Sequence, residues 1–132
     1  MQTPEKVALG KTLFFDTRLS ADNSTACATC HKPDLGFTEQ LATSKGIRDQ
    51  HGQRNTPTIL KAMFNVTQFW DGRAPTLEEQ AKLPILYPVE MSQKAREDVI
   101  AKLNGIPEYK DAFQKVFSRT PNYDDMAKAI AA

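Results

Sequence analysis

The chain has 132 residues, of which 40% are hydrophobic and 25% are charged, and its formal net charge is +1. This length and composition fit one compact globular domain. The near-zero net charge gives no indication of binding to nucleic acid or to an anionic membrane. No apolar run approaches the length of a bilayer span.

The first predicted element is a helix that begins at Pro4. The pair Thr3-Pro4 is typical of an N-cap followed by the first helical residue. The apolar residues that follow before Asp16 are Val7, Leu9, Leu13 and Phe14. The polar stretch 16–24 should form turns, and a short helix is expected after it.

That short helix carries Cys27-Ala28-Thr29-Cys30-His31, which contains the only two cysteines of the chain. Cys-x-x-Cys-His is the attachment motif of c-type haem. Two thiols on one helical turn can add to the two vinyl groups on one edge of the porphyrin, and the following histidine can ligate the iron. The spacing therefore predicts one covalent haem c, with His31 as the axial iron ligand.

Three other uses of paired cysteines fit less well. A zinc site would need four ligands at close spacing, and His51 is the only other histidine. A redox Cys-x-x-Cys usually opens a helix after a strand, and no strand pattern precedes this one. A disulfide between residues three apart would be strained and would close almost no loop.

Residues 32–54 are predicted to form a long loop. Proline and glycine interrupt the helical spacing at Pro33, Gly36, Gly46 and Gly52. Long loops in compact domains are usually functional, so this loop is expected to wrap around the haem.

Two helices are predicted in the middle of the chain. Thr56-Pro57 should begin the first, because it repeats the cap-then-proline signal. Its apolar face would consist of Ile59, Leu60, Met63 and Phe64. Thr76-x-x-Glu79 is a capping box for the second, a short helix that should stop before Pro84.

Three more helices are predicted towards the end. Ser92 should cap the first, which ends at Asn104-Gly105. Its inward residues would be Ala95, Val99, Ile100 and Leu103. Pro107 should open the next, and residues 124–132 should form the last. No strand pattern is found, so the predicted class is all-α with loop-rich haem surroundings.

Six further segments accompany the haem motif in a fixed order. They are LGKTLFFDTRLS at 9–20, GF at 36–37, RNTPT at 54–58, FWDGRA at 69–74, LEEQ at 77–80 and VEM at 89–91. Together they resemble the bacterial di-haem cytochrome c peroxidases and their MauG-type relatives, which have two cytochrome c-like domains with one haem each. The resemblance implies that residues 1–132 are one cytochrome c-like domain, the N-terminal peroxidatic half. A second haem domain would be its partner, and a second Cys-x-x-Cys-His is absent from this chain.

The resemblance also implies three catalytic residues, Glu90, Gln80 and Trp70. Glu90 matches a carboxylate that moves a proton between the two peroxide oxygens. Gln80 matches an amide that hydrogen-bonds the peroxide. Trp70, the only tryptophan, matches a residue proposed to carry electrons between the haems. Without the resemblance, they would be a surface glutamate, a solvent-facing helix residue and a core residue.

Two smaller features accompany these residues. Asn55 matches a ligand of a calcium ion between the two domains of the family. The remaining ligands would belong to the second domain, so we expect weak calcium binding or none. Asp71 and Arg73 flank Gly72 and are expected to form a local ion pair.

The sequence departs from the family at one position. In many members, a histidine in the loop after the haem motif also ligates this haem in the resting enzyme. Here that position holds Ile47, which cannot ligate iron. His51 lies four residues further on and is either a displaced ligand or an exposed loop histidine. We therefore expect a distal iron face without a strong protein ligand.

Three functions follow from these residues. The first is reduction of hydrogen peroxide, with electrons from a small donor protein such as a cytochrome c or a cupredoxin. The second is a monohaem electron-transfer cytochrome, which would use Met63 or Met91 as its sixth ligand. Met63 is predicted on an apolar helix face, where methionine is usually a core residue. The third is MauG-like oxidation of a protein substrate.

Covalent haem attachment normally takes place on the oxidising side of a membrane, so a bacterial periplasmic location is expected. The sequence begins with the polar residues Gln2 and Thr3 after Met1. It therefore contains no signal peptide, and we expect that a leader has been removed or replaced.

Overall fold

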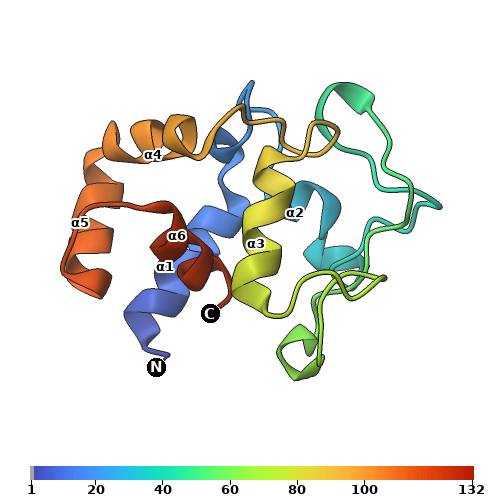
Figure 1. Cartoon of the computed structure of the whole chain (residues 1–132), viewed down its shortest axis with the longest axis horizontal. Coiled ribbons are helices and arrows are strands. Elements are labelled where there is room, and N and C mark those ends of the chain that lie inside the picture. Colours follow the sequence, from blue (N-terminus) through green and yellow to red (C-terminus); the bar gives the residue numbers. More distant parts are fainter. Residues whose placement is uncertain (1) are drawn as a thin grey trace.

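Helix α1 (Pro4–Phe15) crosses helix α6 (Tyr123–Ile130) at the centre of the helical part of the protein (Figure 1). The computed structural model describes residues 2–132. The crossing is close because Gly10 has no side chain: a Cβ atom there would lie 1.9 Å from the carbonyl oxygen of Ala129. Helix α1 begins as predicted, since Thr3 Oγ1 accepts a hydrogen bond from the Lys6 amide at 3.2 Å.

Helices α4 (Arg96–Asn104) and α5 (Pro107–Phe117) complete this helical part. The buried core consists of Leu9, Leu13, Leu19, Ile85, Met91, Val99, Leu103, Tyr109, Phe113, Tyr123, Met126 and Ala129. The predicted helices from Pro107 and at the end of the chain are confirmed. The carboxylate of Asp125 is fully buried in this part and accepts hydrogen bonds from Arg119, Asn122 and Lys128.

The predicted start of α4 was wrong. Ser92 adopts a left-handed backbone conformation with φ of 58°, so it cannot act as the extended N-cap. Ala95 takes the N-cap position without a side-chain hydrogen bond. The predicted end at Asn104, with Gly105 following, is confirmed.

Helix α3 (Leu77–Leu86) lies between the helical part and the loops (Figure 1). Its start is confirmed, because Thr76 Oγ1 accepts from the Glu79 amide at 3.2 Å. The Glu79 carboxylate, however, pairs with Lys82 at 2.7 Å. The prediction that this helix stops before Pro84 was wrong. A proline in the final turns removes one amide donor, and the burial of Ile85 keeps the helix in place.

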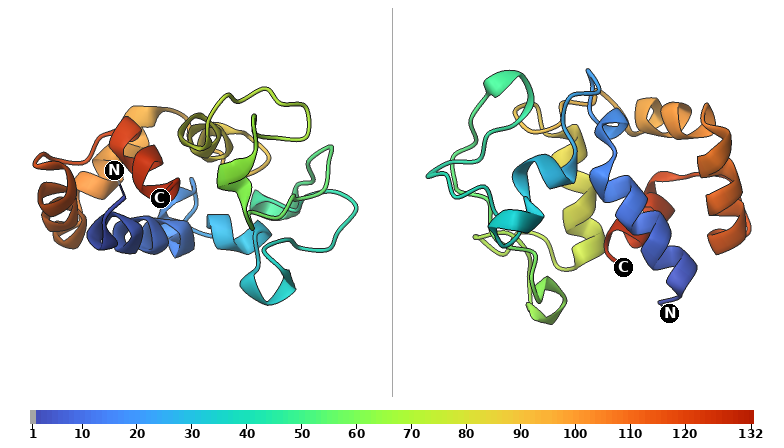
Figure 2. Two further views of the ribbon diagram at one scale, coloured as in Figure 1. Left: turned by 90° about the horizontal axis from the view of Figure 1, so that it is seen from below. Right: turned by 180° about the vertical axis from the view of Figure 1, so that it is seen from behind.

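Residues 31–75, together with the haem-motif helix α2 (Cys27–Cys30), form the other part of the molecule (Figure 2). The long loop after the motif is confirmed. Within residues 31–75 the only helical turns are the short ones at Pro33–Leu35, Ile47–Asp49 and Ala62–Phe64. Residues 2–132 contain isolated bridges but no strand, and the all-α class is confirmed.

The helix predicted from Thr56-Pro57 was wrong. Only Ala62–Phe64 forms a short turn, after the left-handed Lys61. The segment is instead tied to the preceding loop: Thr58 Oγ1 donates to the Gly36 carbonyl at 2.6 Å and accepts from the Leu60 amide at 3.1 Å. The predicted apolar face is therefore exposed rather than packed, and Phe64 is 75% exposed.

No helix within residues 2–132 is long and apolar enough to cross a membrane.

Candidate active site

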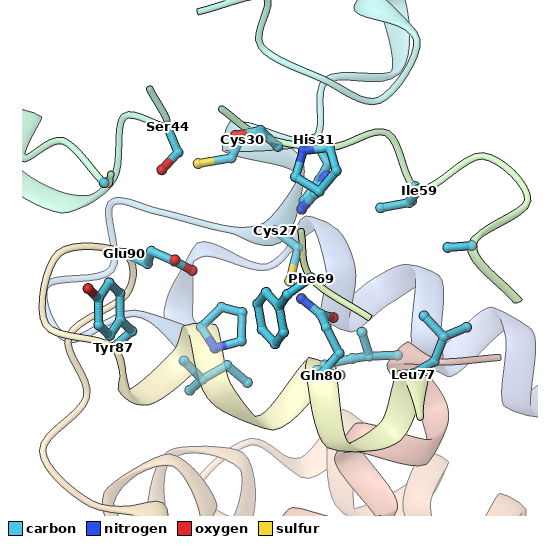
Figure 3. Close-up of a pocket in the computed structure, with 18 of the residues that line it drawn as sticks. Cys27, Cys30, His31, Ser44, Ile59, Phe69, Leu77, Gln80, Tyr87 and Glu90 are labelled. Atoms are coloured by element: carbon cyan, nitrogen blue, oxygen red, sulfur yellow. The ribbon is translucent and has the colours of Figure 1, made fainter. Parts of the chain in front are cut away.

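A cavity of about 620 Å³ lies between α2, α3 and the loops of residues 44–73. This volume is within the range of roughly 300–1,000 Å³ that small-molecule sites occupy. The wall contains Cys27, Cys30, His31, Gln80 and Glu90. Figure 3 shows His31 on one side of this space and Gln80 of α3 on the facing side, with Glu90 pointing in from a third direction.

The proximal histidine is held by the turn that follows it. His31 Nδ1 lies 3.2 Å from the carbonyl oxygen of Phe37 and donates to it, which leaves Nε2 available to the cavity. Burial lowers the pKa of His31 below its ordinary value, which favours the neutral imidazole. Gly36 and Phe37 both have positive φ, 67° and 59°, and this tight turn aims the carbonyl. Beyond the family segment Gly36-Phe37, no sequence pattern indicates the role of the Phe37 carbonyl.

The two thiols lack the lowered pKa that is typical of reactive redox cysteines. Both Cys27 and Cys30 are free and partly buried in the cavity wall. Burial raises the pKa of each thiol to about 12, whereas reactive redox cysteines have lowered values. No group of three or more potential metal-ligating side chains occurs among residues 2–132, as a protein-ligated zinc site would need.

The residues present fit a haem. The cavity is large, two thiols stand on one helical turn, and an imidazole nitrogen faces the same space. The rest of the wall is mostly apolar, as a porphyrin requires, and includes Phe14, Ile59, Phe69, Leu77, Ala81, Pro84, Ile85 and Met91.

Glu90 is half-buried at the edge of this cavity. Burial raises the pKa of its carboxyl; the nearby Arg73 guanidinium acts in the opposite direction, and Glu39 adds to the increase. Such a carboxyl can hold and release a proton closer to neutral pH than an exposed glutamate can. Gln80 reaches the same cavity from α3, so the two residues, which only the family resemblance singled out in the sequence, share a site.

Trp70 lies on the rim of the cavity and is 61% exposed, so it is not a core residue. Its indole Nε1 donates to the Asn55 backbone carbonyl at 3.1 Å. The predicted ion pair beside it is confirmed: Arg73 Nη1 lies 3.0 Å from Asp71 Oδ1. Arg54 also pairs with Asp71, at 2.8 Å, and this cluster fixes the turn that carries Trp70.

The second histidine and Ile47 both lie off the cavity wall. His51 is exposed, and its Nδ1 lies 3.0 Å from the Thr43 hydroxyl. Ile47 is fully buried and does not line the cavity.

The two candidate methionine ligands both line the cavity. Met91 is a core residue, whereas Met63 is 67% exposed on the rim. The expectation that Met63 packs in the core was wrong, because the helix that would have buried it does not form.

The sequence profile described as di-haem cytochrome c peroxidase matches residues 4–132. This chain belongs to that family. Haem c is the cofactor that membership of this peroxidase family implies.

Similar proteins agree with this assignment. The chain is 48% identical over 127 residues to the cytochrome c551 peroxidase of Pseudomonas aeruginosa, covering 94% of this chain and 36% of that protein. It is 43% identical over 127 residues to the cytochrome c peroxidase Ccp of Escherichia coli, covering 96% of this chain and 27% of that protein. This peroxidase-family chain therefore spans about a third of the length of these relatives.

A solved structure has the same fold. A crystal structure of a MauG-like protein associated with microbial copper homeostasis matches with a TM-score of 0.91 and 27% identity. The match covers 99% of this chain and 40% of that one. Nearly the whole chain therefore shares its fold with part of this MauG-like protein.

Proposed function

We propose that this chain is the peroxide-reacting haem domain of a di-haem peroxidase. The reaction is reduction of hydrogen peroxide, with two electrons and two protons, to two molecules of water. The observation that carries the proposal is one cavity with His31 on one side and Gln80 and Glu90 on others. The peroxidase relatives support the same reaction.

The proposal assigns one covalent haem c to Cys27 and Cys30, with His31 as its axial ligand. When bound, this haem supplies the iron that exchanges electrons with peroxide. The His31 hydrogen bond to the Phe37 carbonyl, 3.2 Å long, orients the ring and increases its basicity as a ligand.

Glu90 is the proposed acid–base group. Its carboxylate accepts the proton from one oxygen of hydrogen peroxide and delivers it to the other, which departs as water. The Gln80 amide can both donate to and accept from the peroxide oxygens, so it orients the substrate for this transfer.

The pH dependence follows from the raised pKa of Glu90, which has burial as its main cause. The carboxylate must be ionised to accept the first proton. The rate should therefore fall on acidification at a higher pH than for an ordinary exposed glutamate. Arg73 lowers the same pKa, so Arg73→Gln should move this fall to still higher pH.

The direct test is Glu90→Gln, followed by stopped-flow mixing of the ferric protein with peroxide. The reaction should slow by about a hundredfold or more, the usual contribution of a positioned acid–base group. Haem content should be unchanged. Exposed Glu97 on α4 provides the control: Glu97→Gln should react at the wild-type rate. Wild-type speed in Glu90→Gln would reduce Glu90 to a surface residue.

Trp70 is the proposed route for electrons. Its 61% exposure makes it accessible to a partner. That partner is the second haem domain of the family, which is itself supplied by a small donor such as a cytochrome c or a cupredoxin. Because the second domain is not part of these residues, a donor protein should reduce this chain slowly after peroxide has reacted. Rapid turnover that disappears in Trp70→Phe would instead make Trp70 the direct point of electron entry.

Three further assignments belong to this proposal. Residues 1–132 form one haem domain, the N-terminal half of the larger peroxidase. The chain works in the bacterial periplasm, where haem c is attached. Asn55 contributes one oxygen to a calcium ion whose other ligands come from the second domain; alone it should bind calcium weakly or not at all.

A second candidate is MauG-like oxidation of a protein substrate, which the similarity to a MauG-like structure favours. The exposed Trp70 would then take electrons from the substrate. A third is an electron-transfer cytochrome, favoured by Met63 on the cavity rim. The absorption spectrum of the oxidised protein separates it from the peroxidase, because methionine ligation gives a sulfur-to-iron charge-transfer band.

A further inference from the structure

The tip of the loop 44–54 docks onto the turn that carries Glu90. The Ile47 amide donates to the Glu90 carbonyl at 2.9 Å. The Ile47 side chain is fully buried. At Gly46 the two backbones touch, since a Cβ atom there would lie 2.0 Å from the Val89 carbonyl oxygen and 2.7 Å from Glu90 Cα.

The docked loop is closed by its own hydrogen bonds. The Ser44 amide donates to the Arg54 carbonyl, and the Gly52 amide donates to the Ser44 carbonyl, both at 2.8 Å. The Gly46 amide donates to the Gln50 carbonyl at 2.8 Å. The loop can therefore hold its tip in one position against the Glu90 turn.

The base of the loop is anchored by a carboxylate. Buried Glu39 accepts from the Lys45 amide at 2.9 Å and from the Thr56 hydroxyl at 2.6 Å. The two ends of the loop are thus held to one side chain.

The Glu90 turn itself is fixed by backbone hydrogen bonds and by the buried side chain of Met91. The Glu90 amide donates to the Tyr87 carbonyl at 3.1 Å, and the Met91 amide donates to the Pro84 carbonyl at 3.3 Å. Within residues 2–132, no side-chain hydrogen bond or ion pair holds the Glu90 carboxylate. The position of the backbone at residue 90 therefore decides where the carboxylate points.

We propose that Ile47 is a positioning residue: its buried side chain and its amide lock the loop 44–54 against the Glu90 turn and so aim the Glu90 carboxylate into the cavity. This inference rests on the proposed acid–base function of Glu90. It gives residue 47 a role other than iron ligation. The loop tip is held on the turn, away from the cavity wall.

The test compares two buried residues of the holoprotein. Ile47→Ala should slow the reaction of the ferric protein with peroxide roughly tenfold, because small displacements of catalytic groups cost up to about a hundredfold. Leu103→Ala removes a similarly buried side chain on α4 that does not line the cavity, and it should react at the wild-type rate. Ile47→Val, which keeps most of the side chain, should restore most of the rate.

A second readout does not depend on activity. In Ile47→Ala, hydrogen exchange at the amides of residues 47, 90 and 91 should become faster, whereas Leu103→Ala should leave these amides protected. Gly46→Ala, which adds a methyl group between the two backbones, should produce the same pattern as Ile47→Ala without changing residue 47.

The double variant with Glu90→Gln decides between positioning and general damage. If Ile47 acts through Glu90, then Ile47→Ala should add almost nothing to the loss in Glu90→Gln. Multiplying losses, or a wild-type rate in both Ile47→Ala and Gly46→Ala, would overturn the positioning role. An unchanged rate in Glu90→Gln alone would instead overturn the proposed function.

Discussion

The helical part and the loop part of this protein are stabilised in different ways. Helices α1, α4, α5 and α6 bury their apolar side chains against one another, with Phe113 and Leu13 fully buried. The loops of residues 31–75 bury few, and Phe64 and Val66 remain 75% and 92% exposed. Their order rests on hydrogen bonds and on the wall of the cavity. The comparison indicates that one part folds around its own side chains and the other around a ligand.

The largest effect should come from removing the covalent haem. Cys27→Ala combined with Cys30→Ala should give a chain that folds poorly and whose residues 31–75 lose hydrogen-exchange protection first. The intact mass of the wild-type protein should exceed the polypeptide by one haem, and that of the variant should not. An ordered loop part in a variant without haem would contradict the difference between the two parts.

Two phenylalanines, one from each part of the molecule, test the difference in side-chain burial between the helical part and the loop part. Phe113→Ala should lower the free energy of unfolding by about 3–5 kcal/mol, because it leaves a cavity in the core. Phe64→Ala should change it by less than about 0.5 kcal/mol, because that ring is exposed. Urea titrations of the two holoproteins give the comparison. Similar losses would mean that the loop part has a core of its own.

A smaller, pH-dependent effect should come from Asp125 in the helical part. Burial acts to raise the pKa of this carboxyl, but hydrogen bonds from Arg119, Asn122 and Lys128 outweigh it and lower the pKa to about 2. The folded state therefore favours the carboxylate. The stabilisation, about 2 kcal/mol, is complete above the pKa of the unfolded chain and is lost as pH falls from about 4 towards 2.

The measurement for Asp125 is a series of urea titrations from neutral to acidic pH. Asp125→Asn should be less stable than wild type at neutral pH, and the difference should shrink on acidification. A difference that is independent of pH would show that Asp125 contributes through packing alone.

Sequence reasoning predicted the parts of the fold that depend on local signals. The N-caps at Thr3 and Thr76 and the helix opened by Pro107 needed only neighbouring residues. The helix expected from Thr56-Pro57 failed because the same signal was overridden by a distant partner, the Gly36 carbonyl that accepts from Thr58. Apolar residues spaced for a helix instead line the cavity wall or remain exposed.

The candidate site also contains residues that a local motif predicts and residues that only the tertiary structure brings together. Cys27, Cys30 and His31 form a local motif with a chemical reason for its spacing. Glu90 and Gln80 could be singled out only by resemblance, because their shared cavity is formed by tertiary structure. The contact between Ile47 and Glu90 joins two distant loops, and no pattern within either loop indicates it.

The central claim is that the cavity offers one histidine to the haem and leaves its other sides to Gln80 and Glu90. An electron paramagnetic resonance spectrum of the oxidised holoprotein tests it most directly. Because His51 lies off the cavity wall and Ile47 is buried, we expect a mainly high-spin signal that is unchanged in His51→Ala. A dominant low-spin signal typical of two histidine ligands, lost in His51→Ala, would contradict the claim and make His51 the second ligand.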